Sequence, residues 1–201
     1  MLEIEIKAKI NDINLMKKMF SKNSGVYKLS LIHEDSYFNM PQGLRDFKKT
    51  DEALRVRKSI EYNNTDKNYK QNTNYYLAYK GKKIDKLTKT RKEIEIKVEK
   101  GDELKELLKT LDFLEIFTVK KERELYEFEH KNRHIEALID YIPVLKEYFV
   151  EVEILSDSKE NLDEYRNLLF DFLTLFGIEK EDSITKSYLE LIADRFRGKL
   201  T

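Results

Sequence analysis

The sequence predicts one α+β domain built around an antiparallel β-barrel, with helices packed outside the barrel and at its C-terminal end. Three observations support this fold class. About eight segments have the alternating pattern of strands and are separated by hairpin-scale connections. Only 6 of the 201 residues are glycine, and the last part of the chain has the apolar spacing of helices. A chain of this length can bury one substantial core, so we expect a single domain over residues 1–201.

The expected strands follow one another with short connections. They cover residues 2–10, 30–39, 53–60, 75–81, 89–99, 115–130, 134–142 and 147–155. Helices are expected where apolar residues recur at helical spacing, over residues 12–22, 102–111, 158–176 and 183–196. Asn11-Asp12 supplies an N-cap signal for the first helix, and Gly177 separates the last two. The polar, asparagine-rich stretch 61–74 has no periodicity, so we expect a mobile hairpin loop there.

Composition excludes several classes of function. The 38 basic and 38 acidic residues balance, which gives no support to nucleic-acid binding. The chain has no cysteine, which excludes disulfides, thiolate catalysis and cysteine-ligated zinc. No apolar run approaches the roughly 20 residues that span a bilayer. Charged residues also interrupt the N-terminal segment where a signal peptide would be apolar. We therefore expect a cytoplasmic protein that does not contact membranes.

The first strand alternates strictly between charged and apolar residues. Glu3, Glu5 and Lys7 would lie on one face, because successive side chains of a strand point to opposite sides. Two carboxylates beside an ammonium group can hold a hard divalent cation next to an anionic ligand. The alternative is an amphipathic strand whose charged face meets water.

The same alternation recurs along the chain, for example at Arg55 and Arg57 and through residues 89–99. Two arrangements fit this pattern. The charged faces could lie outside a barrel with an apolar interior. They could instead line a central tunnel while the apolar faces pack against helices. A charged lining would need ion pairing, hydration or an ionic ligand to offset its desolvation. Periodicity alone does not choose between these arrangements.

The N-terminal segment MLEIEIKAK resembles the ExExK signature of the CYTH, or triphosphate tunnel metalloenzyme, superfamily. Further segments match that superfamily in the expected order. They are HEDSYF (33–38), ALRVRK (53–58), LAYKG (77–81), RKEIEI (91–96), VKKERELY (119–126), ALIDYI (137–142), EVEI (151–154) and KSYLELI (186–192). Each motif is weak alone, but the ordered set is specific and extends over nearly the whole chain. The protein is identified on these motifs as a member of the superfamily.

The resemblance implies an eight-stranded antiparallel tunnel with inward-facing charges, a bound Mg²⁺ or Mn²⁺ and a substrate that carries a triphosphate. The residues that match metal ligands are Glu3, Glu5, Asp140, Glu151 and Glu153. Those that match the cationic cradle for the substrate are Lys7, Arg55, Arg57, Lys80, Arg91, Lys121 and Arg123. Lys186 resembles a basic residue that closes the site from the C-terminal helix. Lys7, Arg57 and Lys80 are expected to act in catalysis.

The residue types agree with this chemistry. Carboxylate oxygens suit Mg²⁺ or Mn²⁺, and arginines grip phosphate oxygens in pairs while lysines act as point charges. Catalysis would then consist of positioning and electrostatic stabilisation without a covalent intermediate.

Three functions remain as hypotheses. The favoured one is a class IV, CyaB-type adenylyl cyclase that converts ATP to cyclic AMP and pyrophosphate, because the short single-domain chain and its KSYLEL tail look most like those proteins. The second is a triphosphatase that hydrolyses an inorganic or organic triphosphate. The third is a non-catalytic sensor of nucleotide or polyphosphate, which the full set of acidic residues disfavours. A homodimer formed through the C-terminal helices also remains open.

Overall fold

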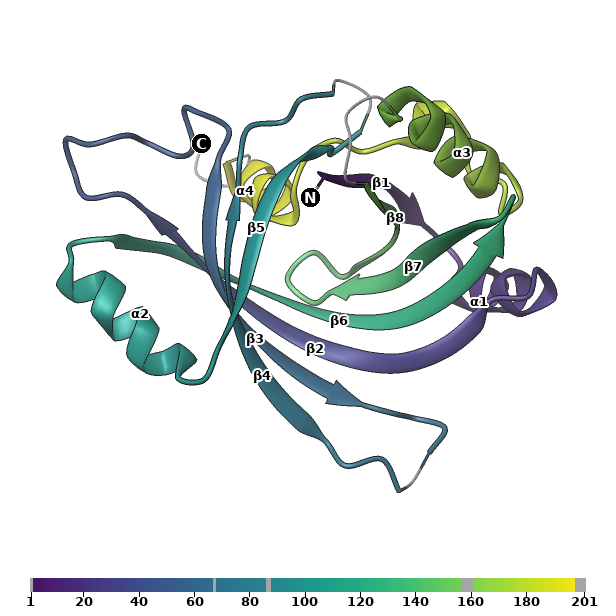
Figure 1. The fold of residues 1–201 in the computed structure, drawn as a ribbon, viewed down its shortest axis with the longest axis horizontal. Helices are drawn as coiled ribbons and strands as arrows, with labels where there is room; N and C mark the ends of the chain where they lie inside the picture. The colour runs from purple at the N-terminus through teal and green to yellow at the C-terminus, as the bar shows by residue number, and fades with distance from the viewer. Residues whose placement is uncertain (1, 67, 86–87, 157–160, 198–201) are drawn as a thin grey trace.

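The computed structural model describes residues 2–66, 68–85, 88–156 and 161–197, and its strands close into one barrel (Figure 1). The strands are β1 (Leu2–Ile10), β2 (Val26–Asn39), β3 (Ala53–Tyr62), β4 (Asn72–Lys80), β5 (Arg91–Val98), β6 (Leu114–His130), β7 (Arg133–Ile142) and β8 (Glu147–Ser156). Their order around the barrel is β1-β5-β4-β3-β2-β6-β7-β8, and neighbouring strands are antiparallel. The predicted eight-stranded antiparallel barrel is therefore confirmed.

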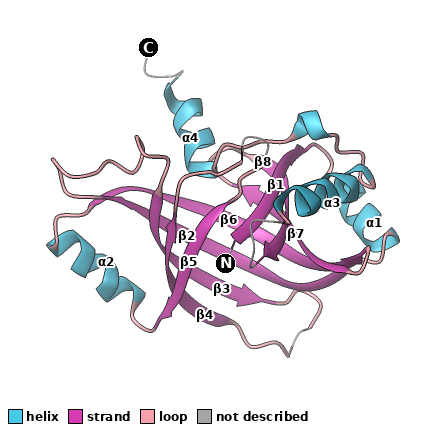
Figure 2. Ribbon diagram, turned by 45° about the horizontal axis from the view of Figure 1, so that its top comes forward, coloured by secondary structure: helices cyan, strands magenta, loops and turns pink. Residues whose placement is uncertain are grey.

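Helices lie outside the barrel (Figure 2). They are α1 (Ile13–Lys22), α2 (Gly101–Thr110), α3 (Leu162–Thr174) and α4 (Tyr188–Arg197), with a short 3₁₀ turn at Lys180–Asp182. Helix α1 begins after Asp12, whose side chain accepts a hydrogen bond from the Leu15 amide, as the N-cap signal predicts. None of the helices in the described ranges is long and apolar enough to cross a bilayer.

The main apolar core lies between the outer face of the barrel and helices α1 and α3. The apolar residues of β1, including Ile4 and Ile6, are fully buried in this core. Phe20 of α1 packs edge-on against Phe128 of β6 and against Phe176, which follows α3. The apolar side of α3 is therefore covered by its own chain. Burial of this outer face turns the charged face of β1 inward.

The alternating pattern allows charged faces either outside the barrel or inside it. In the structure they line the interior. The apolar face of β1 packs against α1 and α3, as a sheet face must be covered by another layer, whereas Ile94 and Ile96 of β5 remain 50% and 53% exposed. On the opposite side of the barrel, α2 places Leu108 against Val56 of β3 in a smaller apolar cluster.

The barrel closes at β1 in an unusual way, because β1 and β5 are paired only at Leu2↔Lys92 and Glu3↔Arg91. Further along β1, the backbone amide of Lys89 donates to the Glu5 carbonyl at 3.0 Å. The amide of Ile184 then donates to the Lys7 carbonyl at 2.7 Å. The segment that precedes α4 therefore adds to the edge of β1 where β5 is not paired with it, and leads into α4.

Several element bounds differ from the prediction. Strand β2 begins at Val26 rather than residue 30, and α4 begins at Tyr188 rather than residue 183 because the preceding residues run along β1. The loop between β3 and β4 is shorter than predicted, because β3 continues to Tyr62 and β4 begins at Asn72. The expected helix 158–176 is observed as α3 from Leu162, and the start of that prediction lies outside the described residues.

A candidate metal and triphosphate site

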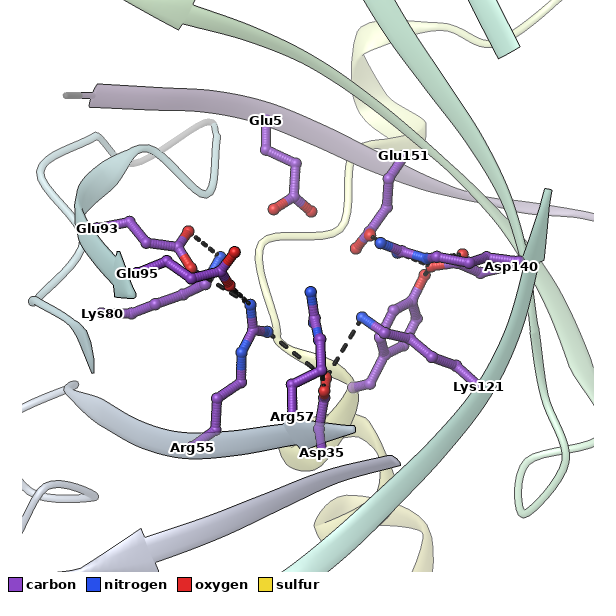
Figure 3. A network of polar contacts seen from close by, with 12 residues as sticks. Glu5, Asp35, Arg55, Arg57, Lys80, Glu93, Glu95, Lys121, Asp140 and Glu151 are labelled. Carbon is purple, nitrogen blue, oxygen red and sulfur yellow. Dashed lines mark hydrogen bonds and ion pairs between the residues drawn. The ribbon is translucent and has the colours of Figure 1, made fainter. Parts of the chain in front are cut away.

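A cavity of about 1100 Å³ occupies the barrel interior, and charged side chains from most of the strands line it. Figure 3 shows acidic side chains of β1, β5 and β8 pointing toward cationic side chains of β3, β4 and β6. Most of the predicted site residues line this cavity: Glu3, Glu5, Arg55, Arg57, Lys80, Arg91, Lys121, Arg123, Glu151 and Glu153. Three others, Lys7, Asp140 and Lys186, are not part of its lining and are described below.

Three carboxylates form a cluster on one wall of the cavity. Glu5 of β1 lies directly opposite Glu153 of β8 in the sheet register, and Glu3 is two residues away on the same face. One oxygen from each of the three lies within 4.8 Å of the others. Because all three donors are hard oxygens, the cluster fits Mg²⁺ or Mn²⁺.

The electrostatics of this cluster also favour a cation. Removal from bulk water and the charges of Glu3 and Glu5 raise the pKa of Glu153 well above its ordinary value. Burial and the charge of Glu151 likewise raise the pKa of Glu5. Mutual repulsion of carboxylates in a site shielded from water has this effect, and a bound divalent ion would relieve it.

The two other predicted metal ligands have different partners in the structure. Arg123 binds Asp140 through two parallel hydrogen bonds of 2.8 and 2.6 Å, and its Nη2 also lies 2.8 Å from Glu151 Oε2. Asp140 is fully buried and accepts a third hydrogen bond, from the Tyr188 hydroxyl, at 2.7 Å. Asp140 and Glu151 therefore hold the Arg123 guanidinium and lie outside the three-carboxylate cluster.

A buried aspartate organises the cations on the opposite wall. Arg57 grips Asp35 through Nε at 2.6 Å and Nη2 at 2.9 Å. Arg55 and Lys121 each lie 3.5 Å from the same carboxylate. Burial alone would raise the pKa of Asp35, but Arg57 and Arg55 lower it well below its ordinary value. Asp35 therefore stays ionised and holds three cations at one place, as a binding site for several phosphate oxygens requires.

A further cation, Lys80, connects the two walls. Its Nζ lies 2.9 Å from Glu3 of the carboxylate cluster and 2.6 Å from Glu93 of β5. Glu93 also lies 3.3 Å from Arg55. Glu93 thereby keeps Lys80 and Arg55 close together despite their like charges. Arg91 is more peripheral, because its nearest partner is the Asp51 backbone carbonyl at 3.5 Å.

Lys89 is a site residue that the motif comparison did not select. Its Nζ contacts Glu5 of the cluster and lies 3.0 Å from Glu151. Lys89 lies in the connecting segment just before β5, where strand alternation no longer strictly predicts which way a side chain points. It is two residues before Arg91, however, so the alternating pattern places both on the same face. Asp35 is a second such residue, within the HEDSYF motif, and its inward direction follows from its register partner Arg57.

The C-terminal segment contributes differently from the prediction. The Lys186 ammonium pairs with Asp194 at 2.8 Å, is half exposed and is not among the residues that line the cavity. Its backbone carbonyl instead accepts a hydrogen bond from the Lys7 ammonium, which is fully buried. Lys7 also lies 4.0 Å from Glu151. Lys7 thus sits behind the cavity lining, where it supports the site from the side of α4.

Lys121 gives the site a testable dependence on pH. Burial and the charges of Arg123 and Arg57 lower its pKa to about 7 from an ordinary value of 10.5, although Asp35 opposes the shift. Between those values the unfolded chain keeps a proton that the folded chain has lost. This contribution to stability therefore increases with pH, by up to about 1.4 kcal/mol per unit.

The measurement is the free energy of unfolding of the ligand-free protein from pH 6 to pH 9. We expect Lys121→Met to flatten the rise with pH relative to the wild type. An identical pH dependence in the two proteins would contradict the assignment of this proton to Lys121.

Comparisons with known proteins agree with this architecture. The chain matches the CYTH domain model over residues 1–188. It is 38% identical over 193 residues to a Methanocaldococcus jannaschii protein named "Putative adenylate cyclase", an alignment that covers 95% of this chain and 98% of that protein. The chain therefore belongs to the CYTH family, and family membership predicted from its motifs is confirmed.

Two solved structures show how far the similarity extends. A Pyrococcus horikoshii protein is 34% identical, with a TM-score of 0.80 over 96% of this chain and 99% of that one. A Hippeastrum protein shares the fold at 19% identity, with a TM-score of 0.63 over 96% of each chain. The Hippeastrum protein is described as a "putative adenylyl cyclase" that reveals a dominant triphosphatase activity.

Proposed function

We propose that this protein is a metal-dependent enzyme that binds a nucleoside triphosphate in the barrel and converts ATP to cyclic AMP and pyrophosphate. One observation carries the proposal: three clustered carboxylates face a group of arginines and lysines across a single cavity. A nucleoside triphosphate has about four negative charges, which such guanidinium and ammonium groups can neutralise. The name "Putative adenylate cyclase" of a 38% identical relative supports the choice of reaction.

The size and lining of the cavity favour a substrate with an organic part. Small-molecule sites usually measure about 300–1000 Å³, so a cavity of about 1100 Å³ is large for inorganic tripolyphosphate. Apolar side chains, including Phe47, Leu155 and Leu189, line it together with the charged ones. Leu155 follows Glu153 on the same face of β8 and is 59% exposed. This apolar surface could accommodate a base next to the phosphates.

In the cyclase reaction, the ribose 3′-oxygen forms a bond to the α-phosphorus and the bond from that phosphorus to pyrophosphate breaks. The hydroxyl proton leaves to water. Glu3, Glu5 and Glu153 would hold the divalent ion, which when bound supplies Lewis-acid stabilisation of charge on phosphate oxygens.

The protein's own side chains would position the substrate for this step. Arg55, Arg57 and Lys121 would bind phosphate oxygens from the opposite wall, already oriented by Asp35. Lys80 lies next to Glu3, where its ammonium would balance charge that develops near the cluster. Because these groups are fixed before the substrate arrives, little reorganisation is needed during the reaction.

A triphosphatase is the second candidate. Water would then attack the terminal phosphorus, while the same carboxylates and cations would serve. This second reaction is retained because a dominant triphosphatase activity is described for the Hippeastrum protein of the same fold. The two reactions differ in which phosphorus the nucleophile reaches.

The deciding experiment incubates purified protein with ATP and either Mn²⁺ or Mg²⁺, followed by chromatographic separation of the products. We expect cyclic AMP and pyrophosphate in equal amounts, and no product when EDTA is present. Release of ADP and phosphate, or cleavage of tripolyphosphate alone, would replace the cyclase with the triphosphatase. Binding of ATP without any turnover would favour the sensor.

A further inference from the structure

Tyr188, the first residue of α4, lies where three lysines from separate parts of the chain converge. The Nζ atoms of Lys7, Lys121 and Lys89 are 4.1, 5.5 and 5.9 Å from the centre of its ring. Only 5% of Tyr188 is exposed. We propose that Tyr188 is a positioning residue that holds Lys89 and Lys121 of the cavity lining in place for a triphosphate, with Lys7 packed against the same ring behind the lining; this inference rests on the proposed function.

The face of an aromatic ring attracts cations electrostatically at distances up to about 6 Å, and more strongly where water is excluded. Lysine side chains are long and flexible, and like charges repel one another. A ring at this point therefore favours a compact arrangement of the three lysine side chains, whose ammonium groups would otherwise separate when protonated. The carboxylates of Glu5 and Glu151 support the same arrangement, because Lys89 contacts both of them.

The ring is itself held from several directions. Its hydroxyl donates to Asp140 at 2.7 Å, and its edge packs against Phe149 of β8 with ring centres 5.2 Å apart. The preceding segment is fixed by the Ile184 amide, which donates to the Lys7 carbonyl. The Lys7 ammonium returns a hydrogen bond to the Lys186 carbonyl. These contacts hold the Tyr188 ring in one position, so the lysines can pack against it.

The consequence for binding is entropic. Each flexible side chain that a ligand must immobilise weakens its binding, and lysines already held against a ring avoid that loss. Loss of the ring should therefore weaken triphosphate binding by about ten- to a hundredfold. Loss of the hydroxyl alone should have a much smaller effect, because Arg123 continues to pair with Asp140.

The test is calorimetric titration of tripolyphosphate with Mg²⁺ into wild type, Tyr188→Leu and Tyr188→Phe. We expect the Leu variant to bind about ten- to a hundredfold more weakly and the Phe variant to bind about as the wild type does. If the reaction is measurable, KM should increase in the Leu variant far more than kcat decreases. Tyr188→Met, which fills more of the same space without a ring, replaces the Leu variant if that protein does not fold.

Tyr126→Leu is the matched control. Tyr126 is equally buried and its hydroxyl also donates to a carboxylate, that of Glu124, but it packs in the outer core. This variant should unfold at a lower temperature and keep the wild-type affinity. Wild-type affinity in Tyr188→Leu, or equal losses in the Phe and Leu variants, would overturn the role of the ring. A wild type that does not bind tripolyphosphate would instead overturn the proposed function.

Discussion

Glu5→Gln should lower metal-dependent turnover by about a thousandfold, because metal ions supply several kcal/mol of transition-state stabilisation in such reactions. Glu5 provides one of the three clustered oxygens and lies opposite Glu153 in the register. Glutamine keeps the shape of the side chain but offers only a neutral oxygen to a hard cation. The fold should remain intact, since the change removes one of three mutually repelling carboxylates and Lys89, which loses the charge of Glu5, keeps its ion pair with Glu151.

Two measurements separate loss of metal from loss of structure. Mn²⁺ should raise the melting temperature of the wild type and leave that of Glu5→Gln unchanged. Glu147→Gln is the control, because Glu147 is also ion-paired, to Lys9 at 2.9 Å, but lies outside the cavity lining. That variant should respond to Mn²⁺ as the wild type does. A Glu5→Gln protein with full metal-dependent activity would refute the role of Glu5 as a ligand.

Arg123→Met should destabilise the ligand-free protein by about 3–5 kcal/mol, the usual effect of removing one partner from a buried ion pair. The guanidinium binds both Asp140 and Glu151, and both residues are buried, at 0% and 4% exposed. Its removal leaves two buried negative charges close together with fewer partners. The free energy of unfolding in denaturant is the appropriate measurement.

The double variant Arg123→Met/Asp140→Asn identifies the cause. Asparagine keeps an oxygen acceptor for the Tyr188 hydroxyl but removes the negative charge, so part of the lost stability should return. Lys9→Met breaks a pair that is half exposed and should change stability by only about 0–1 kcal/mol. Equal destabilisation by the single and double Arg123 variants would show that lost packing, rather than an unpaired charge, dominates.

The barrel could be predicted because its strands are strongly patterned. Glu3, Glu5 and Lys7 alternate with apolar residues that are buried, and a repeat of two residues is the pattern of a β-strand. The bounds of the elements were less accurate where tertiary contacts override local signals. The start of α4 is an example, since the residues before it add to the edge of β1.

The partner of each candidate site residue was harder to predict than the face on which it lies. Asp140 and Glu151, which motif position predicts as metal ligands, both pair with Arg123 in the structure. The backbone carbonyl of Lys186 accepts a hydrogen bond from Lys7, a contact that the motif does not indicate. Motifs name residue types along a strand, but the partner of each charge depends on neighbouring strands that are distant in sequence.

By itself the sequence determined which residues share a face of each strand, because alternation along a strand is a local property of the backbone. Alternation alone could not determine whether the charged faces turn inward, since the pattern is the same in either case; the resemblance to the CYTH superfamily implied that they do. The tertiary structure shows the physical reason, because the apolar face of β1 is buried against α1 and α3. The same folding brought Glu5 opposite Glu153, and Tyr188 among three lysines. These contacts join residues from opposite ends of the chain, and their geometry follows from barrel closure rather than from any local propensity.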